Sequence, residues 1–322
     1  MQSPAIGERS PLTLKHSSFE GEIASSSEPS TIMNILRVPR LIWDFTESNF
    51  ATFVVPNTAF GILGGLTGLP LTSGHATTLS VLQRLPLVVA FNWYSVLIFD
   101  LANQRGPESV AEDQANKPWR PIPAGHAGRY PYRLGAELRP GRLEGGVFIL
   151  ILTWLYNDLR GGDELVRDLI IAVAYGLFNT ASLKIAIGGD AEATITNEGY
   201  AWASIISAVI LTTMQVQDLK DQAGDRGRGR ATVPLFFGDK ASRLSLAVLV
   251  PFWSCVCVHV WHIRSWAVLL PTLSGVMVVV GVLRRRTPET DSWAWKLWCL
   301  WTICLYSLPL VGNGFVSFTA HV

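Results

Sequence analysis

The chain has 322 residues, of which 49% are hydrophobic and only 16% are charged, and its mean hydropathy is +0.29. This composition is too apolar and too poor in charge for an ordinary soluble globular protein. The formal net charge of +1 gives no electrostatic reason to expect nucleic acid as a partner. The composition therefore indicates an integral membrane protein surrounded by membrane lipid.

The N-terminal residues differ from the rest of the chain. Residues 1–34 contain the stretch SSSEPST and no apolar run, so they cannot bury enough apolar surface to offset the entropy of ordering. We expect a disordered tail over residues 1–34. We expect residues 35–322 to form a single transmembrane helical domain.

Apolar runs long enough to cross a bilayer recur along that domain. A helix needs about 20 apolar residues to cross the hydrocarbon layer. The pattern predicts an all-α, polytopic helical bundle with eight apolar segments, of which the one at 146–157 is shorter than the others. These segments lie near 50–70, 78–102, 166–188, 199–217, 244–263, 265–284, 293–316 and 146–157.

Basic residues in the short loops predict the orientation of the bundle, because Lys and Arg concentrate on the cytosolic side. Four basic clusters should face the cytosol, while the acidic loop at 189–198 should face the other side. The clusters are Arg37 with Arg40; Arg105, Lys117 and Arg120; Lys220, Arg226, Arg228, Arg230 and Lys240; and Arg284 to Arg286. We expect the membrane to be the endoplasmic reticulum.

This orientation creates a parity problem between the second and third basic clusters. An even number of crossings must separate two cytosolic loops, yet three apolar pieces lie between them, at 146–157, 166–188 and 199–217. Either one crossing is missing or one is false. The candidate for a missing crossing, 124–146, carries four arginines, two glutamates and two prolines, a charge density that a lipid-facing helix does not tolerate cheaply.

The segment after 199–217 contains three aspartates and three arginines in the run QDLKDQAGDRGRGRATVPLFFG. On one α-helix, Asp218, Asp221 and Asp225 would lie on a single face. Convergent carboxylates repel one another unless a cation lies between them, and Mg²⁺ takes such oxygen ligands while leaving room for phosphate. The alternative interpretation is a solvated helix end with surface ion pairs.

The segment after the second apolar run, NQRGPESVAEDQANKPWRPIPAG, contains a second set of oxygen ligands with cations beside it. We expect Pro107 to end the preceding helix and the later prolines to force an extended exit. The candidate residues are Asn103, Glu108, Glu112, Asp113, Lys117 and Arg120. Alone, the segment could be a proline-rich connector, but its pairing with the first acidic segment on one membrane face favours a shared site.

In both segments the chain resembles the UbiA-type superfamily of intramembrane prenyltransferases and terpene cyclases. The resemblance is carried by NKPWRPIPAG after Asp113 and by QDLKDQAGDRGRGRATVPLFFG, and it covers essentially everything from residue 37 onward. It implies that two Asp-rich loops coordinate Mg²⁺ and hold a prenyl diphosphate, whose tail enters a cavity between the helices. Under this resemblance Asp218, Asp221 and Asp225 carry over as catalytic metal ligands, and Asp113 matches the last acid of the first motif.

The first motif departs from the common Asn-Asp start of the family. Asn103 is followed by Gln104 and lies two residues further from Asp113 than usual, while Glu108 stands roughly where a middle aspartate would be. This variant resembles the fungal branch, which includes membrane-bound terpene cyclases. Asn103, Glu108 and Glu112 complete the predicted metal ligands, and the roles of the two glutamates are left open.

The family fold has nine spans, four of them between the two motifs, which is the parity that the count above lacks. The charged stretch 124–146 stands where the family has its third span. Either a re-entrant segment closes the gap there, or the sequence carries a splicing or gene-model error.

The resemblance predicts a Mg²⁺-dependent terpene cyclase acting on farnesyl or geranylgeranyl diphosphate, with a lean to the longer chain. Lys117, Arg120, Arg226 and Arg230 would bind the diphosphate and neutralise its developing charge, and residues 35–322 would be the catalytic domain. Two alternatives stay open: an aromatic prenyltransferase, and an inactive binder of isoprenoid diphosphates. Aromatic side chains that could line the cavity are Phe60, Trp93, Tyr94, Tyr175 and Phe178.

Overall fold

The computed structural model describes residues 31–74, 76–124, 144–188, 193–284, 286–312 and 314–315. The chain divides into two units, residues 1–38 and 39–322. In the first unit, the described residues belong to helix α1 (Thr31–Asn49), which continues into the second unit. The expected disordered tail falls mostly on residues 1–30, which lie outside the described residues. Within the second unit the described elements are helices. The described residues also include one isolated β-bridge, between Thr72 and Ile195.

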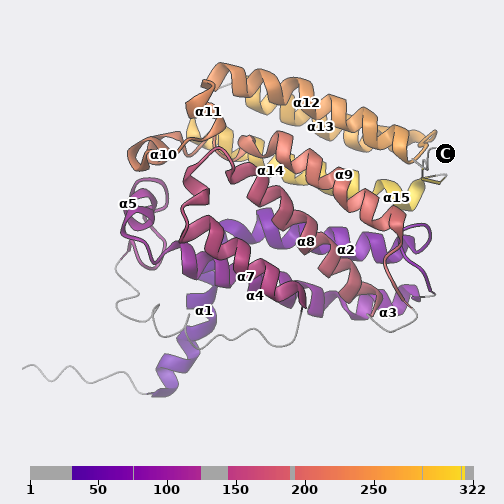
Figure 1. The fold of residues 1–322 in the computed structure, drawn as a ribbon, viewed down its shortest axis with the longest axis horizontal. Coiled ribbons are helices and arrows are strands. Elements are labelled where there is room, and N and C mark those ends of the chain that lie inside the picture. Colours follow the sequence, from indigo (N-terminus) through magenta and orange to yellow (C-terminus); the bar gives the residue numbers. More distant parts are fainter. Residues whose placement is uncertain are drawn as a thin grey trace, which may run out of the picture. The chain divides into compact units, whose positions relative to one another are not determined.

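Seven helical segments of the described chain are long and apolar enough to cross a membrane (Figure 1). They confirm the all-α class and the seven longer apolar runs, and they make the chain an integral membrane protein. The segments are Val38–Thr67, built from α1, η1 (Phe50–Val54) and α2 (Val55–Thr67); α3 (Thr78–Gln83) with α4 (Leu85–Asn103); α8 (Arg167–Ile187); α9 (Asn197–Thr213) with η3 (Met214–Val216); α12 (Asp239–Val260); η4 (Trp266–Val268) with α13 (Leu269–Leu283); and α14 (Pro288–Tyr306) with α15 (Leu308–Val311).

Three spans begin at least five residues earlier than the apolar runs predict, among them α12, which starts at Asp239 rather than near 244. The first starts at Val38 rather than near 50, because α1 passes through the π-helical turn η1 into α2 without a break. The last starts at Pro288 rather than 293, because the Thr287 side chain accepts a hydrogen bond from the Thr290 amide and proline is well suited to the first helical position. Polar first turns hide these starts from a hydropathy pattern.

The short apolar piece at 146–157 forms α7 (Glu144–Asn157), a helix of 14 residues. Its length of about 21 Å is less than the roughly 30 Å of a hydrocarbon layer. It ends beside the end of α4, since Asn103 Nδ2 donates to Asn157 Oδ1 at 3.1 Å. In the described part of the chain, two full spans, α8 and α9, lie between the two charged segments, which is an even number when α7 is not counted as a crossing. Of the stretch 124–146, residues 125–143 lie outside the described residues.

Both charged segments lie at the same end of the bundle, at the left of Figure 1. There α5 (Pro107–Asn116) packs against α10 (Gln222–Arg228), which leads into α11 (Val233–Phe236). Proline at the first position of α5 starts this helix, whereas α4 has already ended at Asn103, so the expectation that Pro107 ends the preceding helix was wrong.

The three aspartates of the second segment do not share one α-helix, and that prediction was also wrong. After α9 the backbone tightens into i→i+3 hydrogen bonds, with Asp218 N donating to Gln215 O at 3.1 Å and Asp221 N donating to Asp218 O at 3.2 Å. Asp221 therefore caps α10, and only Asp225 lies within it. A turn, and not a helix face, sets the relative directions of these carboxylates.

Candidate functional site

A pocket opens at the end of the bundle where α5 meets α10. Part of its lining is polar and charged, and the rest is mainly apolar and includes five aromatic rings. The polar and charged lining consists of Asn49, Asp100, Asn103, Glu112, Asp113, Lys117, Arg120, Arg167, Gln217, Asp221, Asp225 and Arg230; the remaining lining consists of Phe53, Val96, Phe99, Leu152, Thr153, Tyr156, Ile170, Ile171, Ala174, Phe178 and Trp295.

Helix α8 gives the pocket its depth. Arg167, Ile170, Ala174 and Phe178 line it at spacings of three or four residues, which places them on one helix face. Phe178 lies eleven residues beyond Arg167, about 16 Å further along the helix axis. The pocket thus leads from a buried cation into the apolar interior of the bundle.

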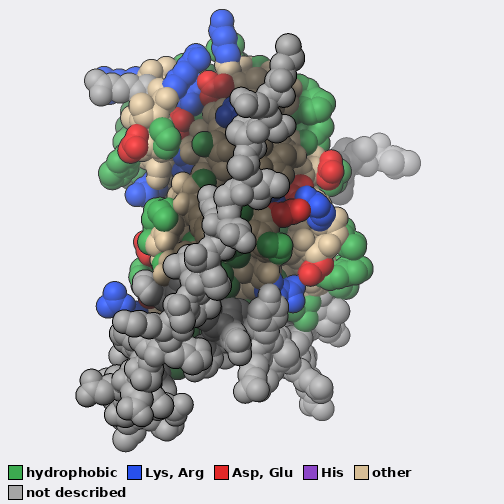
Figure 2. All heavy atoms as spheres, turned by 90° about the vertical axis from the view of Figure 1, so that its left-hand side faces the viewer, with side chains coloured by type: hydrophobic (Ala, Val, Ile, Leu, Met, Phe, Trp, Pro, Cys, Tyr) green, Lys and Arg blue, Asp and Glu red, His purple; other side chains and the backbone are tan. Residues whose placement is uncertain are grey.

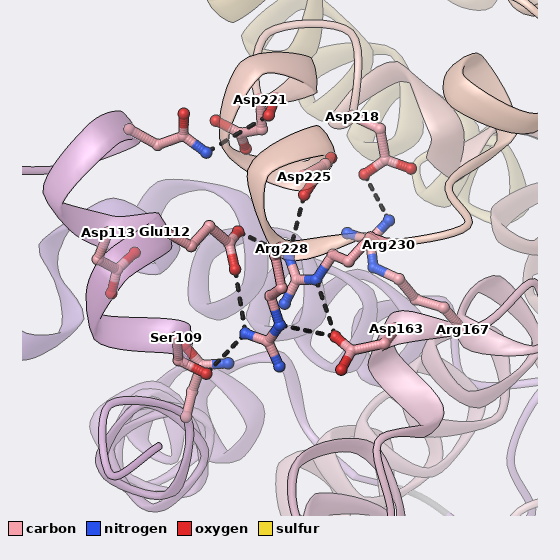
Figure 3. Close-up of polar contacts among 12 residues, drawn as sticks. Ser109, Glu112, Asp113, Asp163, Arg167, Asp218, Asp221, Asp225, Arg228 and Arg230 are labelled. Carbon is pink, nitrogen blue, oxygen red and sulfur yellow. Dashed lines mark hydrogen bonds and ion pairs between the residues drawn. The ribbon is translucent and has the colours of Figure 1, made fainter. Parts of the chain in front are cut away.

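Two carboxylates and two guanidinium groups form a closed ring beside the pocket, which we call the charge quartet: Glu112, Asp163, Arg228 and Arg230 (Figure 3). Glu112 Oε1 accepts from Arg230 Nη1 at 2.7 Å, and its Oε2 accepts from Arg228 Nη1 at 3.0 Å. On the opposite side, Asp163 Oδ1 lies 2.8 Å from Arg228 Nε and 3.2 Å from Arg230 Nε. The quartet joins α5, the segment after α10 and the turn between α7 and α8.

Two aspartates of the second segment lie beside the quartet and are buried. Arg230 Nη1 also donates to Asp225 Oδ1 at 3.1 Å, and Arg167 Nη1 donates to Asp218 Oδ1 at 2.5 Å. Burial raises the pKa of Asp218 to about 6, although Arg167 opposes it. Burial, followed by the negative charge of Asp218, raises the pKa of Asp225. The two carboxylates therefore lie close enough for electrostatic repulsion between them.

Arg120 organises the first segment. Its Nη1 donates to Asp113 Oδ2 at 2.8 Å, and its Nη2 lies 3.3 Å from Asp100 Oδ1 on α4. Asn49 Nδ2 donates to the same Asp100 oxygen at 2.6 Å. Burial and the neighbouring Arg120 lower the pKa of Lys117 to about 8, so this ammonium group is held in a desolvated, strongly cationic environment.

The two segments touch directly through Asn116 and the start of α10. Asn116 Nδ2 donates to the Asp221 carbonyl oxygen at 3.4 Å, and a Cβ atom added at Gly224 would lie 2.2 Å from that nitrogen, so a larger residue at 224 would displace the Asn116 amide. Burial alone would raise the pKa of Asp221, but the ammonium groups of Lys220 and Lys117 outweigh it and lower this pKa. Motifs more than a hundred residues apart thus form one site.

The structure brings most of the sequence-predicted residues to the pocket. Asn103, Glu112, Asp113, Lys117, Arg120, Asp221, Asp225 and Arg230 line it. Asp218 lies just behind, on Arg167. Glu108 does not join the set, since its side chain is 55% exposed and pairs with Arg160 at 2.7 Å. Arg226 is exposed and lies outside the pocket lining.

Sequence reasoning missed five polar residues of this site and the quartet role of Arg228. The five are Asn49, Asp100, Asp163, Arg167 and Gln217. Asp100 and Arg167 carried a signal, because an ionisable residue within an apolar span is usually functional. Asp163 carried none, since it lies in a short turn far from both motifs in the sequence.

Of the five aromatic candidates, only Phe178 lines the pocket. Phe60 packs edge-on against Tyr306 at 5.3 Å between ring centroids, and Trp93 packs against Trp43 and Phe50. Tyr175 is buried and donates to the Thr52 carbonyl at 2.8 Å, while Tyr94 is exposed. The aromatic residues that do line it are Phe53, Phe99, Tyr156, Phe178 and Trp295.

The described residues contain no group of three or more His, Cys, Asp or Glu side chains arranged to hold a metal ion. They do contain spare oxygen donors, because Asp218 Oδ2 and Asp225 Oδ2 are buried with no hydrogen-bond partner. Mg²⁺ commonly takes one or two carboxylates and completes its shell with water and substrate phosphate. The donor chemistry of the site fits such an ion. Figure 2 shows acidic and basic side chains interspersed on the visible part of this face.

Comparisons with known proteins agree with this geometry. Residues 142–301 match the UbiA prenyltransferase family. The chain is 29% identical to diterpene cyclase eriG of Hericium erinaceus, over 81% of this chain and 85% of that protein. It is 27% identical to somaliensene A/B synthase of Streptomyces somaliensis, over 84% and 91%, and 29% identical to polyprenyl transferase eriF of Hericium erinaceus, over 78% and 87%. No solved structure matches it. The chain therefore carries, over residues 142–301, a domain of the UbiA prenyltransferase family.

Proposed function

We propose that this protein is a Mg²⁺-dependent membrane terpene cyclase that ionises and cyclises farnesyl or geranylgeranyl diphosphate, with a lean to the longer chain. The observation that carries the proposal is a single pocket with paired carboxylates and cations at its mouth and aromatic walls along its depth. A prenyl diphosphate has the same division, with a polyanionic head and an apolar tail.

The mouth of the pocket suits the diphosphate head. Arg120, Arg167 and Arg230 present guanidinium groups there, and guanidinium binds phosphate oxygens in a fork. Together with Lys117 they would stabilise the negative charge that develops on the leaving group. Because these cations are already fixed by carboxylates, they need little reorganisation when a polyanion arrives.

Enzymes of this type generally use a divalent metal. When bound, Mg²⁺ would neutralise and polarise the diphosphate oxygens as a Lewis acid. The residues that would hold it are Asp113, Asp221 and Asp225, which line the pocket, with Asp218, Asn103 and Glu112 in support. Glu108 is not among them, because it faces solvent.

The inner pocket suits the carbocation that ionisation leaves behind. Aromatic faces stabilise a cation by about 0.5–2 kcal/mol each, and five aromatic residues line this part. Apolar walls also keep water from the cation until its own distal double bonds react. The roughly 16 Å between Arg167 and Phe178 along α8 provides room for a folded isoprenoid tail.

The runner-up is a prenyltransferase that passes the allyl cation to an aromatic acceptor, and the similarity to a polyprenyl transferase favours it. The similarity to a diterpene cyclase covers a comparable share of the chain and favours cyclisation. Both reactions need the same ionisation, so the distinction lies in what the cation meets.

The deciding experiment supplies microsomes containing this protein with farnesyl or geranylgeranyl diphosphate and Mg²⁺, without any acceptor. We expect release of diphosphate together with a cyclic hydrocarbon or alcohol, detected by gas chromatography and mass spectrometry. Microsomes that carry the Asp225→Ala variant provide the control. Substrate that stays intact until an aromatic acceptor is added would replace the cyclase by the transferase. Binding of substrate without diphosphate release under any condition would support an inactive binder.

We further propose that the protein resides in the endoplasmic reticulum with α5 and α10 facing the cytosol, on the strength of the basic clusters beside them. A glycosylation acceptor inserted in the loop 189–198 should be modified in microsomes. One inserted after Arg286, between α13 and α14, should not, and the reverse pattern would overturn the orientation.

A further inference from the structure

Asp163 is a buried carboxylate for which the proposed mechanism has no use. It ends the short helical turn η2 (Gly161–Asp163) between α7 and α8, and its side chain is 8% exposed. It does not line the pocket. Even so, three guanidinium groups surround it, with Arg160 Nε at 3.1 Å in addition to the two quartet arginines. The Asp163 carboxylate thus pairs with three guanidinium groups outside the substrate cavity.

The backbone that carries Asp163 is held tightly in place. A Cβ atom added at Gly162 would lie 2.5–2.8 Å from ring atoms of Tyr156, and one added at Gly161 would lie 2.7 Å from Ile170. The turn therefore packs directly on α7 and α8. From the other side, the Ala231 amide donates to the Asp163 carbonyl oxygen at 2.7 Å, which fixes the strand of chain that follows Arg230.

The contacts of Asp163 differ in kind from those of Glu112 and Asp225. Asp163 engages the Nε atoms of Arg228 and Arg230, whereas Nη1 of Arg230 faces Glu112 and Asp225. Figure 3 shows Asp163 on one side of the two guanidinium groups and Glu112 on the other. Asp163 thus holds the Nε edge of the Arg230 guanidinium and leaves Nη1 directed at the pocket side, while Arg228 does not line this pocket.

This difference matters when a polyanion enters. Glu112 and Asp225 line the pocket, so an incoming diphosphate competes with them for Arg230. Asp163 lies outside the pocket and keeps its hold on the guanidinium. A fork held at Nε presents its Nη atoms in a defined direction, and such preorganisation strengthens phosphate binding.

We propose that Asp163 is a positioning residue that aims Arg230 at the diphosphate head group. The inference rests on the proposed function, since it assigns the geometry of the same head-group site. It also explains why a carboxylate lies in an otherwise small turn: the turn carries the counter-ion for arginines that belong to a motif about 65 residues away.

The test measures affinity for inorganic diphosphate in the presence of Mg²⁺, by calorimetry on the purified full chain in detergent. Asp163→Asn should weaken binding roughly 10- to 100-fold, the range expected when a hydrogen bond to a charged group is lost. It should raise KM for the prenyl diphosphate by a similar factor and change kcat less. The matched control is Asp158→Asn, since Asp158 pairs at 3.1 Å with Arg105, and both side chains are 42% exposed.

A double-mutant cycle separates positioning from general stabilisation. If Asp163 acts through Arg230, then Asp163→Asn should cause no more than a twofold further loss in an Arg230→Ala background. Unchanged diphosphate affinity in the single variant, or fully additive losses in the cycle, would overturn the proposal. If Asp163→Asn does not yield folded protein, Asp163→Glu keeps the charge but displaces it by one methylene, and wild-type affinity in that variant would equally overturn it.

The binding measurement does not require turnover. A wild type that binds diphosphate but forms no cyclic product refutes the cyclase, while the variant affinities still decide the role of Asp163. A wild type with no affinity for diphosphate overturns both.

Discussion

Replacing Arg167 by methionine tests the buried ion pair on which Asp218 depends. The two side chains are 9% and 2% exposed, and Nη1 lies 2.5 Å from Oδ1. Breaking a buried pair from one side costs about 3–5 kcal/mol, because the remaining charge stays desolvated. Arg167 contacts Oδ1 of Asp218, and Oδ2 has no hydrogen-bond partner in the described chain. No donor at Oδ2 therefore compensates for the loss of Arg167.

The pKa of Asp218 sets where in that range the cost falls. Burial already raises this pKa to about 6 against the opposing effect of Arg167, so losing Arg167 raises it further. The carboxyl can then remain protonated near neutral pH, which limits the cost to about 3 kcal/mol there. A folded-state pKa above the unfolded value means that the folded protein binds more protons. The variant should therefore lose stability as pH rises from about 5 to 8, more steeply than the wild type.

Thermal unfolding followed with a thiol-reactive dye measures this cost, because Cys257 and Cys299 are buried and become reactive on unfolding, while exposed Cys255 sets the baseline. We expect the midpoint of Arg167→Met to fall by roughly 6–12 °C at pH 7. A midpoint within 2 °C of wild type at pH 8 would refute the argument from burial.

The double variant Arg167→Met/Asp218→Leu separates stability from catalysis. Replacing both partners of a buried pair by apolar residues is often neutral or stabilising, so its midpoint should recover. Turnover should not recover, because the pocket has lost a cation and a candidate metal ligand. An active double variant would show that the pair serves the fold alone.

Three further changes address separate parts of the site. Asp225→Ala should reduce turnover by about 10²–10³ with normal membrane insertion, measured by product formation and membrane fractionation; activity near wild type would remove Asp225 from the site. Glu108→Gln should stay within about twofold of wild-type activity, because its exposed pair with Arg160 is worth little, and a large loss would restore Glu108 as a candidate ligand. Phe178→Ala should deepen the pocket and raise the preference for geranylgeranyl over farnesyl diphosphate about tenfold in a competition assay, and an unchanged ratio would show that the tail does not reach this position.

The membrane-spanning helices were predictable because a helix that crosses lipid must carry mostly apolar side chains, which the hydropathy of the sequence shows directly. Seven apolar runs correspond to the seven helical segments of the described chain that are long and apolar enough to cross a membrane. They are helical because a chain in lipid must satisfy its backbone hydrogen bonds within each segment. The errors came where polar residues lie inside helices, as in the start at Val38. They also came where an apolar run is too short to cross, as in α7. Hydropathy reports burial in an apolar medium, and it does not distinguish lipid from the interior of the protein.

The motif residues were predictable in kind but not in geometry. Four acids reach one pocket, Glu112 and Asp113 from the first segment and Asp221 and Asp225 from the second, whereas Glu108 and Asp218 do not line it. The helix-face argument for the three aspartates failed because α9 ends in a turn before Asp218. Partners such as Arg167 and Asp163 lie between the motifs in sequence and join the site only through the packing of α7, α8 and α10. No local pattern encodes which carboxylate a buried arginine will meet.

The ion pairs explain why the proposed diphosphate site, at the end of a membrane bundle, carries both signs of charge. Each carboxylate proposed to hold a metal lies against a cation. The pairs are Glu112 with Arg230, Asp113 with Arg120, Asp218 with Arg167, Asp221 with Lys220, and Asp225 with Arg230. A buried site of one sign alone would face a large desolvation penalty before substrate arrives. With both signs present, phosphate oxygens can take over the guanidinium groups and a divalent cation can take over the carboxylates, so every partner that is displaced finds another of the same charge. The site can thus remain folded and nearly neutral without substrate, and still offer strong ligands to both halves of a metal diphosphate.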